Sequence, residues 1–138
     1  LTGPNHASAE LHGFLSYLAK CAKNDKPYTV FGYNGKQVRD NIHSEDLVRA
    51  FHAVHQNPKA GAVYNIGGGR QSNCSILEAV EMLEHNMGKK MQILHSETHR
   101  RGDHQWYITD NSKFQKDYPE WEMKHDISSI LADLCNTP

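Results

Sequence analysis

Arg39 is the first residue of this chain whose position suggests chemistry. It lies in a β-rich segment with apolar residues at alternate positions, so its side chain would project from a strand whose other face is core. A planar guanidinium can hold phosphate oxygens through paired hydrogen bonds, which a lysine does less well. A salt bridge to Asp40 or Asp46 is the alternative, and the residues alone leave both interpretations open.

A second arginine, Arg100, begins the segment Arg100-Arg101-Gly102-Asp103. The glycine allows a sharp turn that presents a guanidinium and a carboxylate on neighbouring positions. This combination suits a phosphate next to a ribose, because the cation binds the phosphate and the carboxylate accepts hydrogen bonds from the sugar hydroxyls. An exposed loop without a ligand is the alternative for this segment.

The glycine run Gly67-Gly68-Gly69 follows a predicted buried strand and imitates the turn of a dinucleotide-binding unit. Ser72 stands where that fingerprint has its third glycine. The next predicted helix is capped by Ser75, too late for its N-terminus to lie directly on a pyrophosphate. We therefore favour a flexible turn over a phosphate cradle, and assign no cofactor-binding residue here.

Ten histidines raise the question of a metal site. His52 and His55 have helical spacing and His95, His99 and His104 form a series, but no carboxylate or cysteine completes a known ligand spacing. We expect solvated surface histidines and no metal. The three cysteines are odd in number and far apart, which suggests no disulfide framework and fits a reducing cytoplasm.

The composition is that of an ordinary soluble protein. Of its 138 residues, 38% are apolar and 22% charged, and the net charge is −1 with histidine neutral. This balance gives no reason to expect nucleic acid as a partner. The apolar runs are far shorter than the roughly 20 residues that cross a bilayer, so we expect no membrane partner either. Since the chain opens at Leu1 within a turn-like segment, we expect it to be part of a longer protein.

Hydrophobic periodicity and turn signals indicate an α/β fold. Helices are predicted over about 10–24, 44–57 and 75–87, from Asp110 or Asn111, and over about 126–134. Strands are predicted over 28–31, 37–42, 62–66, 91–94 and 106–108. Ser44 is the expected cap of the helix over 44–57, and Ser75 with Glu78 forms a capping box for the helix over 75–87.

Several motifs occur in a fixed order and cover nearly the whole chain. They are Leu1-Thr2-Gly3-Pro4, Gly13-Phe14-Leu15, Thr29-Val30-Phe31-Gly32, the segment from Gly35 to Leu47, the segment from Val63 to Gly69, and Arg100-Arg101-Gly102-Asp103. Together they resemble the carboxyl-terminal part of an extended short-chain dehydrogenase/reductase of the NAD-dependent epimerase/dehydratase family. Within that family the segments 1–6, 10–15 and 102–104 look most like epimerases that act at C2 of a CDP-linked dideoxyhexose.

This resemblance implies a substrate, a nucleotide-diphosphate sugar, and residues that bind it. It assigns substrate binding to Gly13, Phe14, Thr29, Val30, Phe31, Arg39, Arg100 and Asp103. Both arginines would bind the diphosphate and Asp103 the ribose, while 29–31 would lie against the base and 13–14 would open the helix that covers the ligand. Residues 1–138 would form the substrate-binding part of the enzyme plus the last elements of its Rossmann sheet.

The resemblance also implies the cofactor and the reaction. NAD⁺, held mainly by an amino-terminal half, would take a hydride from the sugar carbon, and the hydride would return to the other face of a keto intermediate. The family's Tyr-x-x-x-Lys catalytic pair and glycine-rich NAD fingerprint are absent from these 138 residues. We therefore assign no catalytic residue and expect this chain alone to be inactive, as part of a cytoplasmic homo-oligomer. A 4,6-dehydratase or reductase of the same family, or a non-catalytic nucleotide-binding module, are the alternatives.

A further expectation concerns the surface. In the whole protein the helix over 44–57 and the strand over 62–66 would pack against a nucleotide-binding sheet. This chain should then expose a large apolar patch around Val48, Phe51, Val63 and Ile66, whereas a fully covered core would indicate an autonomous domain.

Overall fold

The computed structural model describes residues 1–6, 13–98 and 102–136. Its elements are α1 (Phe14–Lys23), β1 (Tyr28–Phe31), the 3-10 turn η1 (Tyr33–Gly35), β2 (Val38–Asp40), α2 (Ser44–Gln56), β3 (Asn73–Ser75), α3 (Ile76–Met87), β4 (Ile93–Ser96), β5 (Trp106–Tyr107), α4 (Ser112–Asp117) and α5 (Ile127–Asn136). Helices mixed with parallel strand pairs confirm the predicted α/β class.

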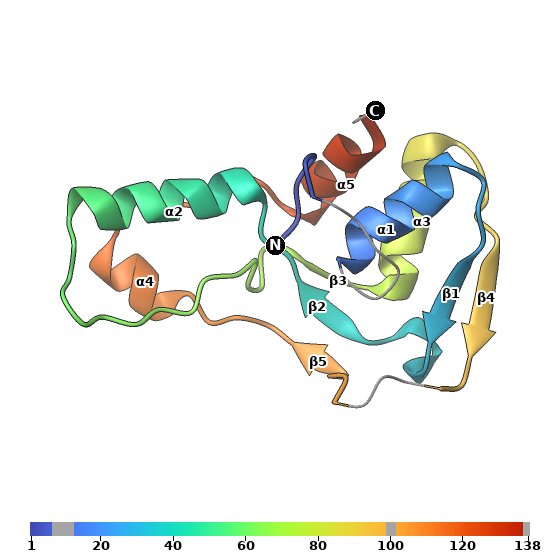
Figure 1. Ribbon diagram of the computed structural model, residues 1–138, viewed down its shortest axis with the longest axis horizontal. Helices are drawn as coiled ribbons and strands as arrows, with labels where there is room; N and C mark the ends of the chain where they lie inside the picture. The colour runs from blue at the N-terminus through green and yellow to red at the C-terminus, as the bar shows by residue number, and fades with distance from the viewer. Residues whose placement is uncertain (7–12, 99–101, 137–138) are drawn as a thin grey trace.

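The strands form two small sheets. In one, β1 and β4 are parallel, with Tyr28 opposite Ile93. In the other, β2 is the central strand, antiparallel to β3 and parallel to β5, so that Arg39 stands between Cys74 and Tyr107. Figure 1 shows α1, α3 and α5 gathered on the side of the first sheet and α2 with α4 on the opposite side, with β2 and β5 between the two groups.

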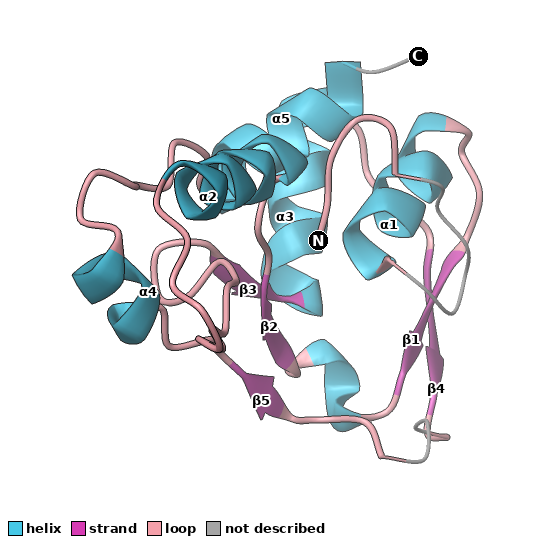
Figure 2. Cartoon of the chain, turned by 60° about the vertical axis from the view of Figure 1, so that its left-hand side comes forward, coloured by secondary structure: helices cyan, strands magenta, loops and turns pink. Residues whose placement is uncertain are grey.

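The buried side chains follow this division into two clusters. The larger cluster fills the space between α1, α3, α5 and β1, and its fully buried members include Leu15, Leu18, Leu83, Ile130 and Leu131. The smaller cluster joins α2 to α4 through Ile42, Ala50, Phe114, Tyr118 and Trp121. Figure 2 shows, from a second direction, α4 on one side of the chain and α1 with β1 and β4 on the other. No helix in the described ranges has the length and apolar character needed to cross a bilayer.

Two predicted helix caps have different outcomes. Glu78 N donates to Ser75 Oγ (3.2 Å) and Ser75 N donates to Glu78 Oε2 (2.7 Å), so the capping box of α3 is confirmed. The cap predicted at Ser44 is wrong, because Glu45 N donates instead to Nδ1 of His43 (3.2 Å). A parallel bridge to Thr2 keeps His43 extended, which makes it the last residue before the helix.

The predicted strand at 62–66 is also wrong. Its residues have no strand neighbour among those described, and a strand exists only when its backbone groups pair with another. Side chains hold the segment instead: Tyr64 donates to Asp117 Oδ2 (2.6 Å) and packs edge-on against Phe114. The strand predicted at 91–94 forms two residues later, and the short β3 was not predicted.

Part of the chain's apolar surface faces solvent. Val48, Phe51 and Val63 are 62%, 60% and 77% exposed. Ile66 is half-buried against the smaller cluster. Of the four residues around which a large apolar patch was expected, Val48, Phe51 and Val63 are exposed, whereas Ile66 is not.

Candidate functional site

Arg39 forms an ion pair with Asp103. Its Nη2 donates to Asp103 Oδ1 at 2.8 Å, and its Nη1 donates to the backbone oxygen of Val38 at 2.8 Å. The two side chains keep 21% and 14% of their surface exposed. Neither carboxylate considered as an alternative partner binds Arg39: Asp40 and Asp46 accept hydrogen bonds from other groups. The structure thus joins the arginine of one motif to the aspartate of another.

Parallel pairing of two strands brings these residues together. Val38 N donates to Gln105 O (2.9 Å), which aligns the start of β5 with β2. Gly102 has φ +77°, in the left-handed region that favours glycine, and it precedes Asp103 directly. The turn at Gly102 therefore places the carboxylate beside the strand that carries the guanidinium.

The ion pair lies at a pocket of about 520 Å³. Of the residues expected to bind substrate, the structure places Gly13, Phe14, Phe31, Arg39 and Asp103 on its wall. Thr29 is half-buried in β1 and is not part of the wall, and the Val30 side chain lies in the core at 1% exposed. Arg100 lies outside the described residues. Ligand contacts by these residues remain predictions.

Gly13 is required by the shape of the pocket. Its φ is +68°, and a Cβ there would lie 2.2 Å from Cε1 of His6. The same residue is the N-cap of α1 and has no side chain to satisfy the first N–H groups of the helix. Since Gly13 and Phe14 line the pocket, the positive end of α1 adjoins it, which favours an anionic ligand.

Sequence reasoning missed two polar residues of this wall, His6 and Gln37. Nδ1 of His6 and Oε1 of Gln37 are buried, and neither has a hydrogen-bond partner among the described residues. A signal for Gln37 was present: it stands two positions before Arg39, and alternate residues of an extended segment share a face.

The glycine run is a turn that protein side chains hold in place. Gly67 N donates to Asn111 Oδ1 (3.1 Å), and Gly69 N donates to Asp40 Oδ2 (2.8 Å). A Cβ on Gly68 would lie 2.2 Å from Asn41 O, so the backbone passes too close for any other residue. The N–H groups of Gly67 and Gly69 are thus engaged within the protein, and the run is a turn held by side chains, whereas a flexible turn was expected.

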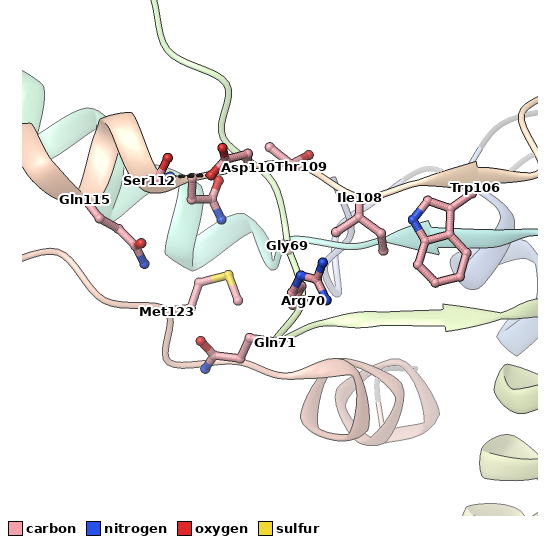
Figure 3. A pocket seen from close by; sticks show the side chains of 12 residues that line it. Gly69, Arg70, Gln71, Trp106, Ile108, Thr109, Asp110, Ser112, Gln115 and Met123 are labelled. Atoms are coloured by element: carbon pink, nitrogen blue, oxygen red, sulfur yellow. Dashed lines mark hydrogen bonds between the residues drawn. The ribbon is translucent and has the colours of Figure 1, made fainter.

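A second pocket of about 630 Å³ lies beside this turn (Figure 3). Arg70, Gln71 and Met123 extend around it, and Trp106 stands at its far side, 67% exposed. Asp110 is engaged with the Ser112 N–H (2.9 Å). None of the expected substrate-binding residues that the structure describes lines this pocket, so we place the candidate site at the Arg39–Asp103 pair.

Among the described residues, one group of side chains has the spacing of metal ligands: His43, His125 and Asp133. The two imidazoles are stacked, with centroids 4.0 Å apart and planes 26° from parallel, so their in-plane lone pairs do not converge. Nδ1 of His43 accepts the Glu45 N–H, which places the proton of the neutral ring on Nε2. We therefore assign no metal there. The histidines considered from the sequence are not members of this group, and His99 lies outside the described residues.

Comparison with known proteins identifies the family. The family model described as NAD dependent epimerase/dehydratase family matches residues 1–67. A CDP-paratose 2-epimerase of Salmonella typhi is 33% identical over 91 residues, which covers 64% of this chain and 26% of the relative. A dTDP-glucose 4,6-dehydratase of Xanthomonas campestris pv. campestris (strain B100) is 31% identical over 138 residues, which covers 94% of this chain and 38% of the relative.

Solved structures agree. A UDP-glucuronic acid 4-epimerase from Bacillus cereus, in complex with UDP-glucuronic acid and NAD, has a TM-score of 0.78 and 29% identity over 89% of this chain and 38% of that one. A UDP-glucose 4-epimerase from Bifidobacterium longum, in complex with NAD⁺ and UDP, has a TM-score of 0.77 and 28% identity. The match covers 90% of this chain and 38% of that one. The chain thus spans well under half of the length of these relatives. Its motifs, its fold and these similarities show that it belongs to the NAD-dependent epimerase/dehydratase family of extended short-chain dehydrogenases/reductases.

Proposed function

We propose that this chain is the sugar-nucleotide-binding portion of an NAD-dependent sugar-nucleotide epimerase that acts at C2 of a CDP-linked sugar. The observation that carries the proposal is the Arg39–Asp103 pair at the pocket, which offers a cation for a diphosphate beside a carboxylate for a ribose. The similarity to the Salmonella typhi CDP-paratose 2-epimerase supports the choice of a CDP-sugar.

Arg39 can hold an anion in the state that the structure shows. Two of its N–H groups are engaged, with Asp103 and with the Val38 carbonyl, and these bonds fix the plane of the guanidinium before a ligand arrives. The remaining N–H groups are available to diphosphate oxygens. A hydrogen bond to a charged group contributes about 1.5–3 kcal/mol, so this contact would be a large part of the binding energy.

Arg100 is proposed as the second cation. It stands three residues before Asp103, so their Cα atoms are at most roughly 11 Å apart even in an extended chain. A long arginine side chain spans much of that distance. Both arginines would supply positive charge to one diphosphate, and the positive end of α1 adjoins the pocket that Arg39 lines.

The glycine run of this chain does not form a binding site for the pyrophosphate of NAD. Gly67 and Gly69 of the glycine run already donate their N–H groups to Asn111 and Asp40, so the run offers no cradle to a pyrophosphate. We propose that NAD is held by parts of the protein outside this chain. The contribution of this chain is to bind and orient the substrate.

A 4,6-dehydratase is the second candidate function. The Xanthomonas campestris dTDP-glucose 4,6-dehydratase aligns with 94% of this chain, more than the 64% aligned with the CDP-paratose 2-epimerase. NMR analysis of the product separates the two, because an epimer keeps every hydroxyl group and inverts one carbon centre, whereas a dehydratase product has lost a hydroxyl group as water. Incubation of the intact protein with NAD⁺ and a CDP-sugar or a dTDP-sugar is the required assay.

Titration calorimetry on the intact protein tests the proposed site. Arg39→Ala should weaken CDP binding by about ten- to one-hundred-fold, the equivalent of one charge-assisted hydrogen bond. Arg70→Ala is the matched control, because Arg70 is an exposed arginine that lines the other pocket, and it should change the affinity by less than about twofold. Equal affinities of the Arg39 variant and the wild type would contradict the proposal.

A further inference from the structure

Gln37 carries a polar atom that the protein leaves unpaired at the candidate site. The residue is 6% exposed and lines the same pocket as Arg39 and Asp103. Oε1 is buried and accepts no hydrogen bond from any described residue. A buried acceptor without a donor costs free energy, so such an atom in a folded protein calls for an explanation.

Contact with β1 fixes the orientation of the amide. Nε2 of Gln37 donates to the backbone oxygen of Phe31 at 3.2 Å. Turning the amide over would bring its oxygen against the Phe31 oxygen, which places two acceptors together. The free atom is therefore the carbonyl oxygen, and only a hydrogen-bond donor can satisfy it.

The position of Gln37 relates this acceptor to the expected ligand. Gln37 directly precedes β2 and Arg39 is the middle residue of that strand, and both residues line the pocket. Arg39 reaches toward Asp103, whereas Gln37 reaches toward Phe31 of β1. The family resemblance assigns residues 29–31 to the base, so we expect the base on the Phe31 side of the pocket, the side toward which Gln37 reaches.

We propose that Gln37 reads the base of the nucleotide by accepting a hydrogen bond at Oε1 from the 4-amino group of cytosine. The inference rests on the proposed function, because it concerns the same pocket. Cytosine carries a donor at position 4, whereas uracil and thymine carry a carbonyl oxygen there, and that oxygen would meet the Gln37 oxygen as a second acceptor.

The test compares the affinities of CDP, UDP and TDP for the intact protein by calorimetry. The wild type should bind CDP about tenfold or more tightly than UDP or TDP, because a mismatched pair leaves a buried acceptor unpaired. Gln37→Met keeps the approximate volume and removes the acceptor, so it should bring the three affinities within about threefold. Gln37→Glu keeps an acceptor oxygen and should retain the preference for CDP at lower overall affinity.

Lys36→Met, at the exposed neighbouring position, is the matched control and should leave the preference unchanged. The ratio of two affinities measured on one sample does not depend on how much of it is folded, so a destabilised Gln37→Met protein still reports on the inference. A wild type that binds UDP or TDP as well as CDP, or a Gln37→Met variant that weakens all three by the same factor, would overturn the role of Gln37 alone. No measurable binding of any of the three would overturn the proposed function and this inference with it.

Discussion

Arg39 and Asp103 lie 64 positions apart in the sequence and form a 2.8 Å ion pair at the wall of one pocket. Both side chains keep some contact with water. Removing one partner therefore does not leave a fully buried, unpaired charge, which is the costly case. Substitution of either residue should report on ligand binding more than on folding.

Asp103 should distinguish ribose from deoxyribose. Its carboxylate is bound to Arg39 through Oδ1 and has further lone pairs for the sugar hydroxyls. We expect wild-type intact protein to bind CDP about three- to tenfold more tightly than 2′-deoxy-CDP, the effect of one hydrogen bond. Asp103→Ala should bring the two affinities together, as measured by calorimetry.

The matched control for this experiment is Asp110→Ala, a substitution in the other pocket that should preserve the preference for CDP. If Asp103→Ala weakens both ligands and keeps their ratio, the aspartate orients Arg39 and does not bind the ribose.

A side chain at Gly13 should be destabilising, for two separable reasons. Its positive φ disfavours any L-residue, and a Cβ would collide with His6. Gly61 has a similar φ of +71°, and a Cβ there would meet nothing within 4 Å. Gly61→Ala therefore measures only the free-energy cost of a side chain at positive φ, about 1 kcal/mol. Gly13→Ala should lower the free energy of unfolding by about 1 kcal/mol more than Gly61→Ala in urea titrations. Equal losses would show that His6 moves aside without cost.

The features that could be predicted from the sequence depend on residues close together along the chain. Ser75, Glu78 and Gly88 mark both ends of α3, and each signal acts within one or two helical turns. Such signals need no knowledge of the rest of the fold.

The features that could not be predicted depend on distant partners. The cap of α2 moves from Ser44 to His43 because Thr2, more than forty residues earlier in the chain, holds His43 extended. The ion pair of Arg39 with Asp103 depends on the pairing of β2 with β5, and a two-residue strand such as β5 has no periodicity that could indicate its neighbour. The sequence marked both residues as candidates, and only the fold brings them together.

The stability of the protein should fall in mild acid through His43. Burial of the ring, together with the charge of nearby His125, lowers the pKa of His43 below its ordinary value of 6.5, although Asp133, Asp46 and Glu45 oppose the shift. The unfolded chain therefore takes up this proton at a higher pH than the folded chain does. The stabilising contribution is complete above pH 6.5 and is lost as the pH falls below that value.

His43→Asn tests this assignment in urea titrations between about pH 8 and pH 5. The oxygen of asparagine can accept the Glu45 N–H and so keep the helix cap. Because the asparagine side chain does not take up a proton in this pH range, the free energy of unfolding of the variant should fall less steeply below pH 6.5 than that of the wild type. His43→Ala removes the cap as well and should cost about 1 kcal/mol at pH 8. Identical pH profiles of wild type and His43→Asn would place the acid sensitivity elsewhere.

Phe51 should be buried in the intact protein. It is 60% exposed in this chain and stands one helical turn from Val48, which is 62% exposed. If the rest of the protein packs on this face, Phe51→Asp should lower the free energy of unfolding of the intact protein by about 2–4 kcal/mol, because an apolar contact is lost and a charge is placed in the interface. His52→Asp, at the adjacent exposed position, is the control and should change it by less than about 0.5 kcal/mol. If both substitutions lower the free energy of unfolding by similarly small amounts, this face of α2 is exposed to solvent in the intact protein. The rest of the protein then does not pack on Phe51.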